Sequence, residues 1–152
     1  MTETIYDLLR ESHEIQRSML RKLLRSKAGS RDRIAQFTDL RVELGAHEAA
    51  EERFLYVPML MDDRGLDSSR HALHEHHQID ELIEDIRSLD PAGDAWLNKT
   101  RELSKKVHHH LHEEERKFFQ VSGKILGDVE KTRLARQYRN DYTRMQKVLR
   151  AT

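Results

Sequence analysis

The segment between residues 93 and 126 has an apolar helical stripe that only two polar residues interrupt. At three- and four-residue spacing the stripe runs through Leu103, Val107, His110, Glu114, Phe118, Val121 and Ile125. Residues at this spacing share one face of a helix, so His110 and Glu114 are predicted to point into the core. The neighbouring stripe through His109 is polar throughout, which predicts a solvent-exposed His109. Because a buried carboxylate is costly unless it is paired or bound to a metal ion, the fold must provide partners for Glu114.

Three other segments repeat this pattern. Between residues 31 and 60, His47 and Glu51 interrupt a stripe formed by Phe37, Leu40, Leu44, Leu55 and Pro58. His76 interrupts a stripe formed by Leu73, Ile79, Ile83 and Ile86, and His13 one formed by Tyr6, Leu9, Leu20 and Leu24. Four histidines and two glutamates are therefore predicted to face inward. The other histidines of the two clusters, His71, His74, His77, His108, His109 and His112, are predicted to be exposed, and the aromatic residue Tyr56 to be an ordinary core residue.

Sequence spacing supports the same six residues independently. His13 and His47 are 34 residues apart, as are His76 and His110, and a glutamate follows each second histidine at the fourth position. The two halves therefore superimpose with an offset of 63 residues. Six inward donors are too many for one tetrahedral ion and fit a pair of metal ions. Without metal, we expect the two glutamates to be protonated or to draw in water.

Four breaks divide the chain into helices. Residues 28–30, 62–65, 90–93 and 127–128 are rich in glycine, proline, serine and aspartate, which interrupt helices. The predicted helices span residues 3–27, 31–60, 68–88, 93–126 and 128–150. We expect an all-α, single domain over residues 1–152: an up-down-up-down four-helix bundle in residues 3–126 and an additional C-terminal helix. That fifth helix covers the bundle or forms a homodimer contact.

Composition excludes several classes of function. Lys+Arg and Asp+Glu are equal at 27 each, so the net charge gives no reason to expect a nucleic-acid or anionic-membrane partner. The chain has no cysteine, which excludes disulfides and thiolate ligands. No stretch approaches the roughly 18 apolar residues of a membrane span, and the N-terminus does not resemble a signal peptide. We therefore expect a cytoplasmic protein.

Four motifs resemble those of the hemerythrin-like (HHE cation-binding) family. They are "SHEIQRSML" around His13, "HEAAEERFLY" from His47, "HEHHQIDELI" around His76 and "HHLHEEERKFF" around His110. The resemblance covers residues 3 to 126 and implies a four-helix bundle around a non-heme di-iron centre. It also implies that the four histidines are terminal ligands and that Glu51 and Glu114 bridge two iron ions.

The motifs depart from those of oxygen-carrying hemerythrins. Those proteins have a second histidine four residues after the one on the third helix, where this sequence has Asp80 after His76. Their last motif is HxxxxD, whereas His110 is followed by Glu114 at the fourth position and Glu115 at the fifth. Glu114 fits the repeat and the inward face. These departures disfavour reversible oxygen carriage and leave a centre richer in carboxylates.

The ligand set and the resemblance together predict a di-iron protein that acts on or senses oxygen, peroxide or nitric oxide. Zinc and manganese are compatible substitutes for iron at such ligands. The expected partner is a small diatomic molecule or peroxide, and peroxide decomposition is the enzymatic activity to test. Three alternatives stay open: iron handling or repair of iron centres, a metal-dependent regulatory module, and a metal-free bundle with His–Glu ion pairs. Participation of Glu48 or Glu115 as a further ligand also stays open.

Overall fold

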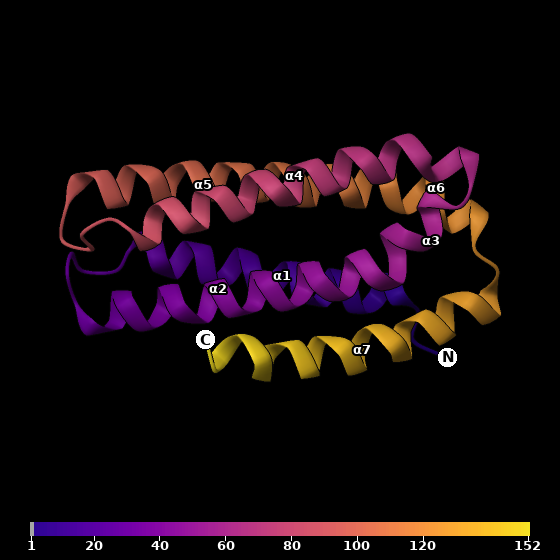
Figure 1. Cartoon of the computed structure of the whole chain (residues 1–152), viewed down its shortest axis with the longest axis horizontal. Helices are drawn as coiled ribbons and strands as arrows, with labels where there is room; N and C mark the ends of the chain where they lie inside the picture. The colour runs from indigo at the N-terminus through magenta and orange to yellow at the C-terminus, as the bar shows by residue number, and fades with distance from the viewer. Residues whose placement is uncertain (1) are drawn as a thin grey trace.

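The computed structural model describes residues 2–152, which form five continuous helices and no strand (Figure 1). The first helix is α1 (Ile5–Leu24). The second comprises α2 (Arg31–Glu51), the π-helical segment η1 (Glu52–Tyr56) and α3 (Val57–Leu60). The third is α4 (Asp63–Arg87). The fourth comprises α5 (Asp94–Glu113), the π-helical segment η2 (Glu114–Phe118) and α6 (Phe119–Ile125), and the fifth is α7 (Asp128–Arg150). The predicted all-α fold with a C-terminal fifth helix is confirmed.

Short polar residues determine where the helices begin. The Thr4 hydroxyl accepts a hydrogen bond from the backbone N–H of Asp7, whose carboxylate accepts one from the backbone N–H of Thr4. This reciprocal capping box fixes the start of α1. The predicted start of the third helix at residue 68 is wrong, because Asp62 accepts a hydrogen bond from the backbone N–H of Arg64 and caps α4 at that point.

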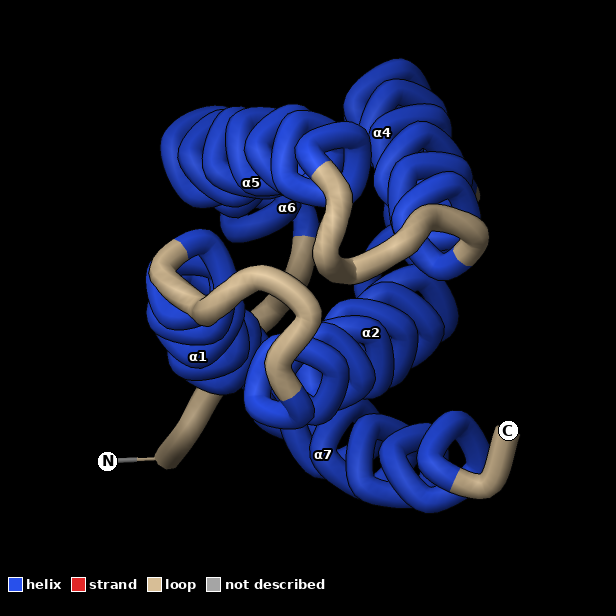
Figure 2. The backbone as a smooth tube through the Cα atoms, turned by 90° about the vertical axis from the view of Figure 1, so that its left-hand side faces the viewer, coloured by secondary structure: helices blue, strands red, loops and turns tan. Residues whose placement is uncertain are grey.

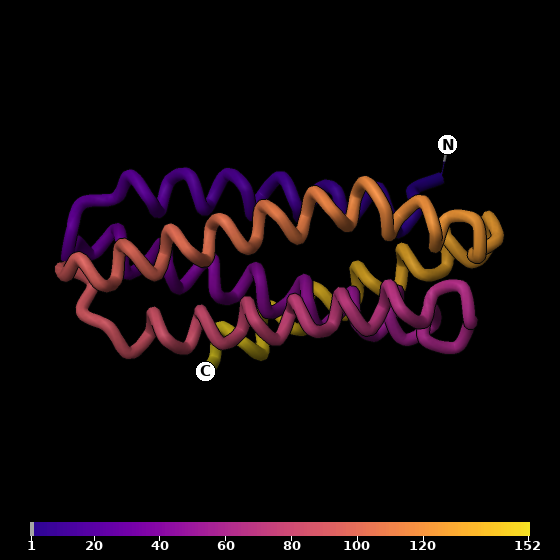
Figure 3. Tube along the Cα trace, turned by 90° about the horizontal axis from the view of Figure 1, so that it is seen from above, coloured from indigo at the N-terminus to yellow at the C-terminus, as the bar shows by residue number. Residues whose placement is uncertain are grey.

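The first four long helices form an antiparallel bundle. The connections after α1 and after α4 lie at one end of the molecule, and those after α3 and α6 lie at the other (Figures 1 and 3). Viewed along its axis, the bundle has α1, α2, α4 and α5 at its corners (Figure 2). Side chains from all four helices can therefore meet on the bundle axis.

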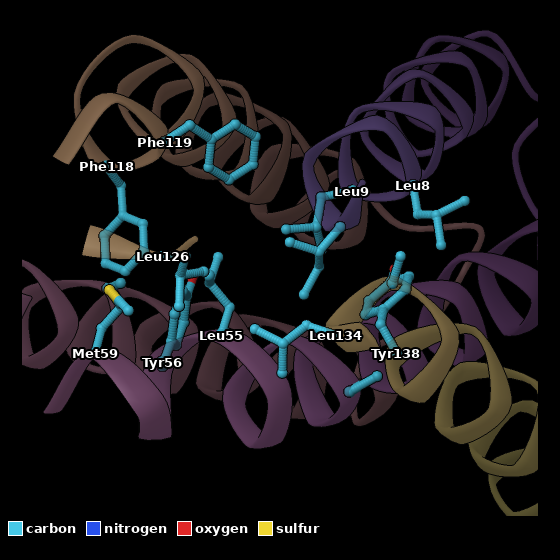
Figure 4. Packing of buried hydrophobic residues seen from close by; sticks show 14 residues of the cluster. Leu8, Leu9, Leu55, Tyr56, Met59, Phe118, Phe119, Leu126, Leu134 and Tyr138 are labelled. Atoms are coloured by element: carbon cyan, nitrogen blue, oxygen red, sulfur yellow. The ribbon is translucent and has the colours of Figure 1, made fainter. Parts of the chain in front are cut away.

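Two apolar clusters fill the two ends of the bundle. The cluster shown in Figure 4 includes Leu9, Leu55, Tyr56, Phe118 and Leu134. The other includes Leu20, Leu40, Ile83, Trp96 and Leu103. On α1, His13 lies between Leu9 of the first cluster and Leu20 of the second. The inward polar residues thus occupy a layer with apolar packing on both sides.

The helix α7 covers the face formed by α1 and α2 (Figure 2). It buries Leu134, Ala135 and Tyr138 against the bundle. A side chain at Gly45 would place its Cβ 2.7 Å from Cδ1 of Leu149, so the glycine allows α7 to approach α2 closely. The fifth helix therefore covers the bundle, while its use in a homodimer stays a prediction.

The outward faces of the helices are charged. They carry pairs such as Glu84 with Arg87 and Lys99 with Glu102, each three residues apart on one helix. Across residues 2–152, no helix combines the length and the apolar character that crossing a membrane would require.

Truncation of one apolar anchor on α7 tests how firmly this helix is held. Leu134→Ala should lower the free energy of unfolding by about 3 kcal/mol, because it leaves a cavity at a residue that is 5% exposed. Val129→Ala, on the same helix at a residue 81% exposed, should change it by less than about 0.5 kcal/mol. Urea denaturation measures both. Equal, small effects would show that α7 is not packed on the bundle.

Candidate metal centre

The structure brings all six predicted ligand residues together in the middle of the bundle. His13 lies on α1, His47 and Glu51 on α2, His76 on α4, His110 on α5, and Glu114 at the start of η2. Each is at most 3% exposed. The inward orientation that helical spacing predicted is therefore observed for every member of the set.

Their donor atoms form two adjacent groups of four that share both glutamates. The first group is His13, His47, Glu51 and Glu114, and the second is Glu51, His76, His110 and Glu114. Within each group the donor atoms lie within 4.8 Å of one another. Two ions at these positions would have both carboxylates in common.

Glu51 and Glu114 each lie between histidines from different helices. Oε1 of Glu51 is 3.3 Å from Nε2 of His47 and 3.3 Å from Nε2 of His76. Oε1 of Glu114 is 3.1 Å from Nε2 of His13, and its Oε2 is 3.6 Å from Nε2 of His110. Each carboxylate therefore joins one histidine of the first group to one of the second.

Four of these buried atoms have no hydrogen-bond partner in the described chain. They are Nε2 of His13, Nε2 of His47, Oε2 of Glu51 and Oε1 of Glu114. Although the atoms approach each other closely, they are not aligned as donor and acceptor. An unsatisfied buried polar group costs about 1–3 kcal/mol. All four belong to the first donor group, so one bound cation would satisfy all of them, and the residues present fit a metal ion.

The hydroxyl of Tyr56 lies between the two carboxylates. It donates to Oε1 of Glu51 at 2.8 Å and contacts Oε2 of Glu114, and it is 3.3 Å from Nε2 of His76. Burial, reinforced by the two adjacent carboxylates, raises the pKa of Tyr56 well above its ordinary value, so the phenol keeps its proton. Tyr56 is buried in the core, as predicted, but the sequence did not indicate that its hydroxyl contacts both carboxylates.

The π-helical segment η1 explains why helical spacing did not reveal Tyr56. An α-helix places the fourth residue after Glu51 on the same face, whereas a π-helical turn is wider and places the fifth residue there. Tyr56 is that fifth residue. The segment η2 makes the same kind of turn next to Glu114, where the sequence has no proline. A π-helical turn therefore accompanies each of the two shared glutamates.

The outer nitrogen of each histidine has its own partner. Nδ1 of His13 is 2.7 Å from Glu115, that of His76 is 2.8 Å from Glu52, and that of His110 is 2.9 Å from Glu75. Nδ1 of His47 is 2.9 Å from the hydroxyl of Tyr138 on α7. Such partners fix the ring orientation and leave Nε2 for a metal ion.

The internal repeat includes some of these hydrogen-bond partners but not all of them. Glu52 and Glu115 are 63 residues apart and hold equivalent histidines. The position equivalent to Glu75 is Ser12, and there Tyr138 of α7 takes the place of a carboxylate. Phe119 is equivalent to Tyr56 and lacks a hydroxyl. The two donor groups therefore have the same ligand types but different surroundings.

Nearby carboxylates favour the protonated form of two imidazoles in the centre, His13 and His76. Burial alone would lower the pKa of His13, but the carboxylates of Glu114 and Glu115 outweigh burial and raise it to about 9. Burial likewise opposes protonation of His76, and the carboxylates of Glu48, Glu51 and Glu52 raise its pKa well above the ordinary value.

The pKa of Glu51 differs from what its burial alone would give. Burial would raise its pKa, but the nearby imidazoles of His47 and His76 hold the pKa of Glu51 well below the ordinary value. Without metal, Glu51 therefore favours its charged form over the protonated form that was one of two expected outcomes. The other expected outcome, entry of water, stays a prediction.

The two additional candidate carboxylates, Glu115 and Glu48, make other contacts, and their use as ligands stays a prediction. Glu115 binds Nδ1 of His13 and pairs with Arg17 at 2.9 Å. Glu48 is buried beside Asp80, and burial together with that like charge raises its pKa well above the ordinary value. Both lie outside the two donor groups that share Glu51 and Glu114.

Most of the remaining histidines lie on the surface, as predicted. His71, His74, His77, His109 and His112 are exposed. The prediction is wrong for His108, which is half-buried because its Nδ1 is 2.7 Å from the backbone oxygen of Ser104 and the ring lies along the helix.

Comparison with known proteins decides the family. The hemerythrin HHE cation binding domain matches residues 4–121. The chain belongs to this family. The fold is similar to that of a crystal structure of a hemerythrin HHE cation binding domain-containing protein from Mycobacterium kansasii, with a TM-score of 0.85 and 21% identity over 96% of this chain and 89% of that chain. The sequence matches no curated protein closely enough to indicate a specific activity.

Family membership and geometry agree on cation binding. The HHE domain is a cation-binding domain, and this member buries two groups of His and Glu donors that can hold metal ions. Imidazole and carboxylate together suit iron, zinc and manganese, and the donors alone do not select among them.

A pair of histidine variants tests the assignment of ligands in this HHE domain. We predict two metal ions per chain after iron loading, as measured by elemental analysis. His110→Ala should abolish binding at the second position, because Nε2 of His110 is one of its donors. His112→Ala removes an exposed imidazole two residues along α5 and should leave the iron content unchanged. Equal iron loss in both variants would contradict the assignment.

Metal binding should stabilise the fold and release protons. Binding to Nε2 displaces the protons that His13 and His76 carry at neutral pH, so roughly two protons per chain should appear. Metal affinity should therefore rise with pH, most steeply below about 9, the pKa at which His13 is half deprotonated. The melting temperature should rise with metal concentration, since a ligand at 100 times its Kd adds about 2.7 kcal/mol. Calorimetry in buffers of different ionisation enthalpy counts the protons, and a melting temperature indifferent to iron and chelator would contradict binding in the core.

Proposed function

We propose that this chain is a cytoplasmic non-heme di-iron protein that acts on peroxide and also binds or senses oxygen or nitric oxide. One observation carries the proposal: two groups of four buried donors share Glu51 and Glu114, so each carboxylate can hold two ions at once. Two metal ions in such a site can bind and activate one small ligand together. When bound, iron supplies the electrons for this chemistry, which zinc cannot do.

The space around the centre limits the substrate to small molecules. A cavity of about 80 Å³ lies between α4 and the fourth helix and reaches His110 and Glu114. Ala72 and Phe118 form part of its wall, and both are buried. Oxygen, nitric oxide and hydrogen peroxide fit a cavity of this size. Peroxide is favoured among them because its disproportionation to water and oxygen needs no outside reductant.

Tyr56 is the residue placed to handle a proton in this reaction. Its hydroxyl is the only O–H among the described side chains that contacts both shared carboxylates, and it keeps its proton because of its burial and the charge beside it. From this position it can donate a hydrogen bond or a proton to an oxygen atom that approaches Glu51 and Glu114. A positioned proton donor of this kind contributes about 10²–10⁴-fold to a rate.

Iron handling is the second candidate function. It is favoured by a group of histidine and glutamate side chains beside the cavity, which includes the exposed His71 and the partly buried Glu113. In that case the centre would hold iron for transfer, and peroxide turnover would be slow.

Oxygen evolution from hydrogen peroxide tests the primary proposal. The iron-loaded protein should evolve oxygen faster than free iron at the same concentration. Tyr56→Phe should retain both irons and lose about a hundredfold in rate, because it removes the proton donor. Tyr6→Phe is the matched control, since it removes a hydroxyl that bonds only Ser122 away from the centre.

The alternative outcomes separate the candidates. Oxygen evolution no faster than with free iron, from protein that holds two irons, would contradict the peroxide proposal and favour iron handling. Equal rates for Tyr56→Phe and Tyr6→Phe would contradict the role of Tyr56 alone.

A further inference from the structure

Only one of the two equivalent faces of the bundle is covered. The 63-residue repeat relates α1 and α2 to α4 and α5, and α7 packs on α1 and α2 (Figure 2). On the covered face, Leu8, Ala46 and Ala50 are at most 6% exposed. Within residues 2–152, no helix covers the equivalent face of α4 and α5. The side chains on that face therefore do not need to be apolar, as those on the covered face are.

The residues equivalent to this apolar set are all potential metal ligands. Shifted by 63 positions, Leu8, Ser12, Ala46 and Ala50 correspond to His71, Glu75, His109 and Glu113. If this face only had to be soluble, any polar residues would suffice at these positions. Instead, all four are histidine or glutamate, the side chains that bind first-row divalent cations.

These four side chains converge on the surface of α4 and α5, and we call them the outer cluster. Donor atoms of His71, Glu75 and Glu113 lie within 4.8 Å of one another. Nε2 of His71 is 3.6 Å from Glu75 and 3.7 Å from Glu113. Nε2 of His109 is 3.1 Å from Glu113 and 3.9 Å from Glu75. Both carboxylates are therefore shared by the two imidazoles.

The outer cluster lies at the mouth of the cavity that reaches the inner donors. His71, Glu75 and Glu113 line this cavity together with His110 and Glu114. Glu75 connects the two sites directly: Oε1 is 2.9 Å from Nδ1 of His110, while Oε2 faces Lys106 and His109. The cavity extends beyond the cluster to the inner donors His110 and Glu114, and Glu75 joins the cluster to His110 by a hydrogen bond.

Two lysines make the outer cluster a weak site. Lys106 is 3.5 Å from Glu75, and Lys117 is 3.8 Å from Glu113. Both lysines compete with a cation for the carboxylates. A site that passes ions onward must bind them strongly enough to collect them and weakly enough to release them. Competing lysines and partial exposure fit transfer better than storage.

We propose that the outer cluster is a third cation site, which collects a divalent ion such as Fe²⁺ from solvent and delivers it through the cavity to the inner centre. The proposal rests on the proposed function, because the inner centre must take up metal. It explains why the uncovered face carries metal ligands and why the cavity opens there. The carboxylates attract the hydrated ion, and exchange of its water for His71 and Glu113 begins its dehydration.

The rate of metal loading tests the transfer role. Co²⁺ is the probe, since its absorption bands report filling of the inner centre in a stopped-flow experiment. The double variant His71→Ala/Glu113→Gln should load about tenfold more slowly, at the lower end of rate effects from charged clefts, with the same final spectrum. The control is His77→Ala/Glu81→Gln, which removes an exposed pair 3.1 Å apart elsewhere on α4. Loading of the first variant at the rate of the control would overturn the transfer role.

A second measurement tests the site without relying on the inner centre. Titration with Mn²⁺, followed by the electron paramagnetic resonance signal of the free ion, counts the bound ions. The His71→Ala/Glu113→Gln variant should lose one weakly bound equivalent that the control variant keeps. Equal numbers in the two variants would overturn the outer site. A wild-type protein that binds only the weak equivalent would instead contradict the inner di-metal centre, and so the two failures are distinct.

Discussion

The carboxylates of Glu51 and Glu114 are fully buried between two apolar clusters, and the rest of the structure is arranged around their charge. Four imidazoles from four helices approach them, and the phenol of Tyr56 contacts both. Charges so far from water are tolerated only with such partners. The four-helix bundle meets this requirement, because each of its four helices brings one histidine to a common layer.

Four positions show how a repeated sequence becomes an asymmetric protein. The repeat supplies equivalent ligands, and α7 then covers one half, where Tyr138 replaces a carboxylate partner. The other half keeps Glu75 and an open face. Tyr56 places its hydroxyl on one side only, since Phe119 stands at the equivalent position. The two donor groups therefore have the same ligand types and different hydrogen-bond partners, and the cavity reaches His110 and Glu114 of the second group.

The six inward residues were predictable because each histidine or glutamate lies on a helical face whose other residues are apolar. A polar residue on such a face must point into the core with its neighbours. The helix bounds were predicted from glycine, proline and capping residues. The predicted start of the third helix was wrong, because a side-chain hydrogen bond of Asp62 starts α4 earlier. Tyr56 was missed because the π-helical turn changes which residue faces inward. The pairing of His47 with Tyr138 was not predictable, because it depends on how α7 docks. The lowered pKa of Glu51 was not predictable, because it is set by distances to imidazoles that sequence spacing does not provide.

Anomalous X-ray diffraction from crystals of anaerobically iron-loaded protein tests the central claim most directly. The claim is that two ions share Glu51 and Glu114 inside the bundle. At the iron edge, the data should show two peaks about 3.5–4 Å apart, the spacing of ions in two-metal sites, with both carboxylates between them. A single peak in the core, or iron only at surface histidines with the inner His–Glu contacts intact, would contradict it.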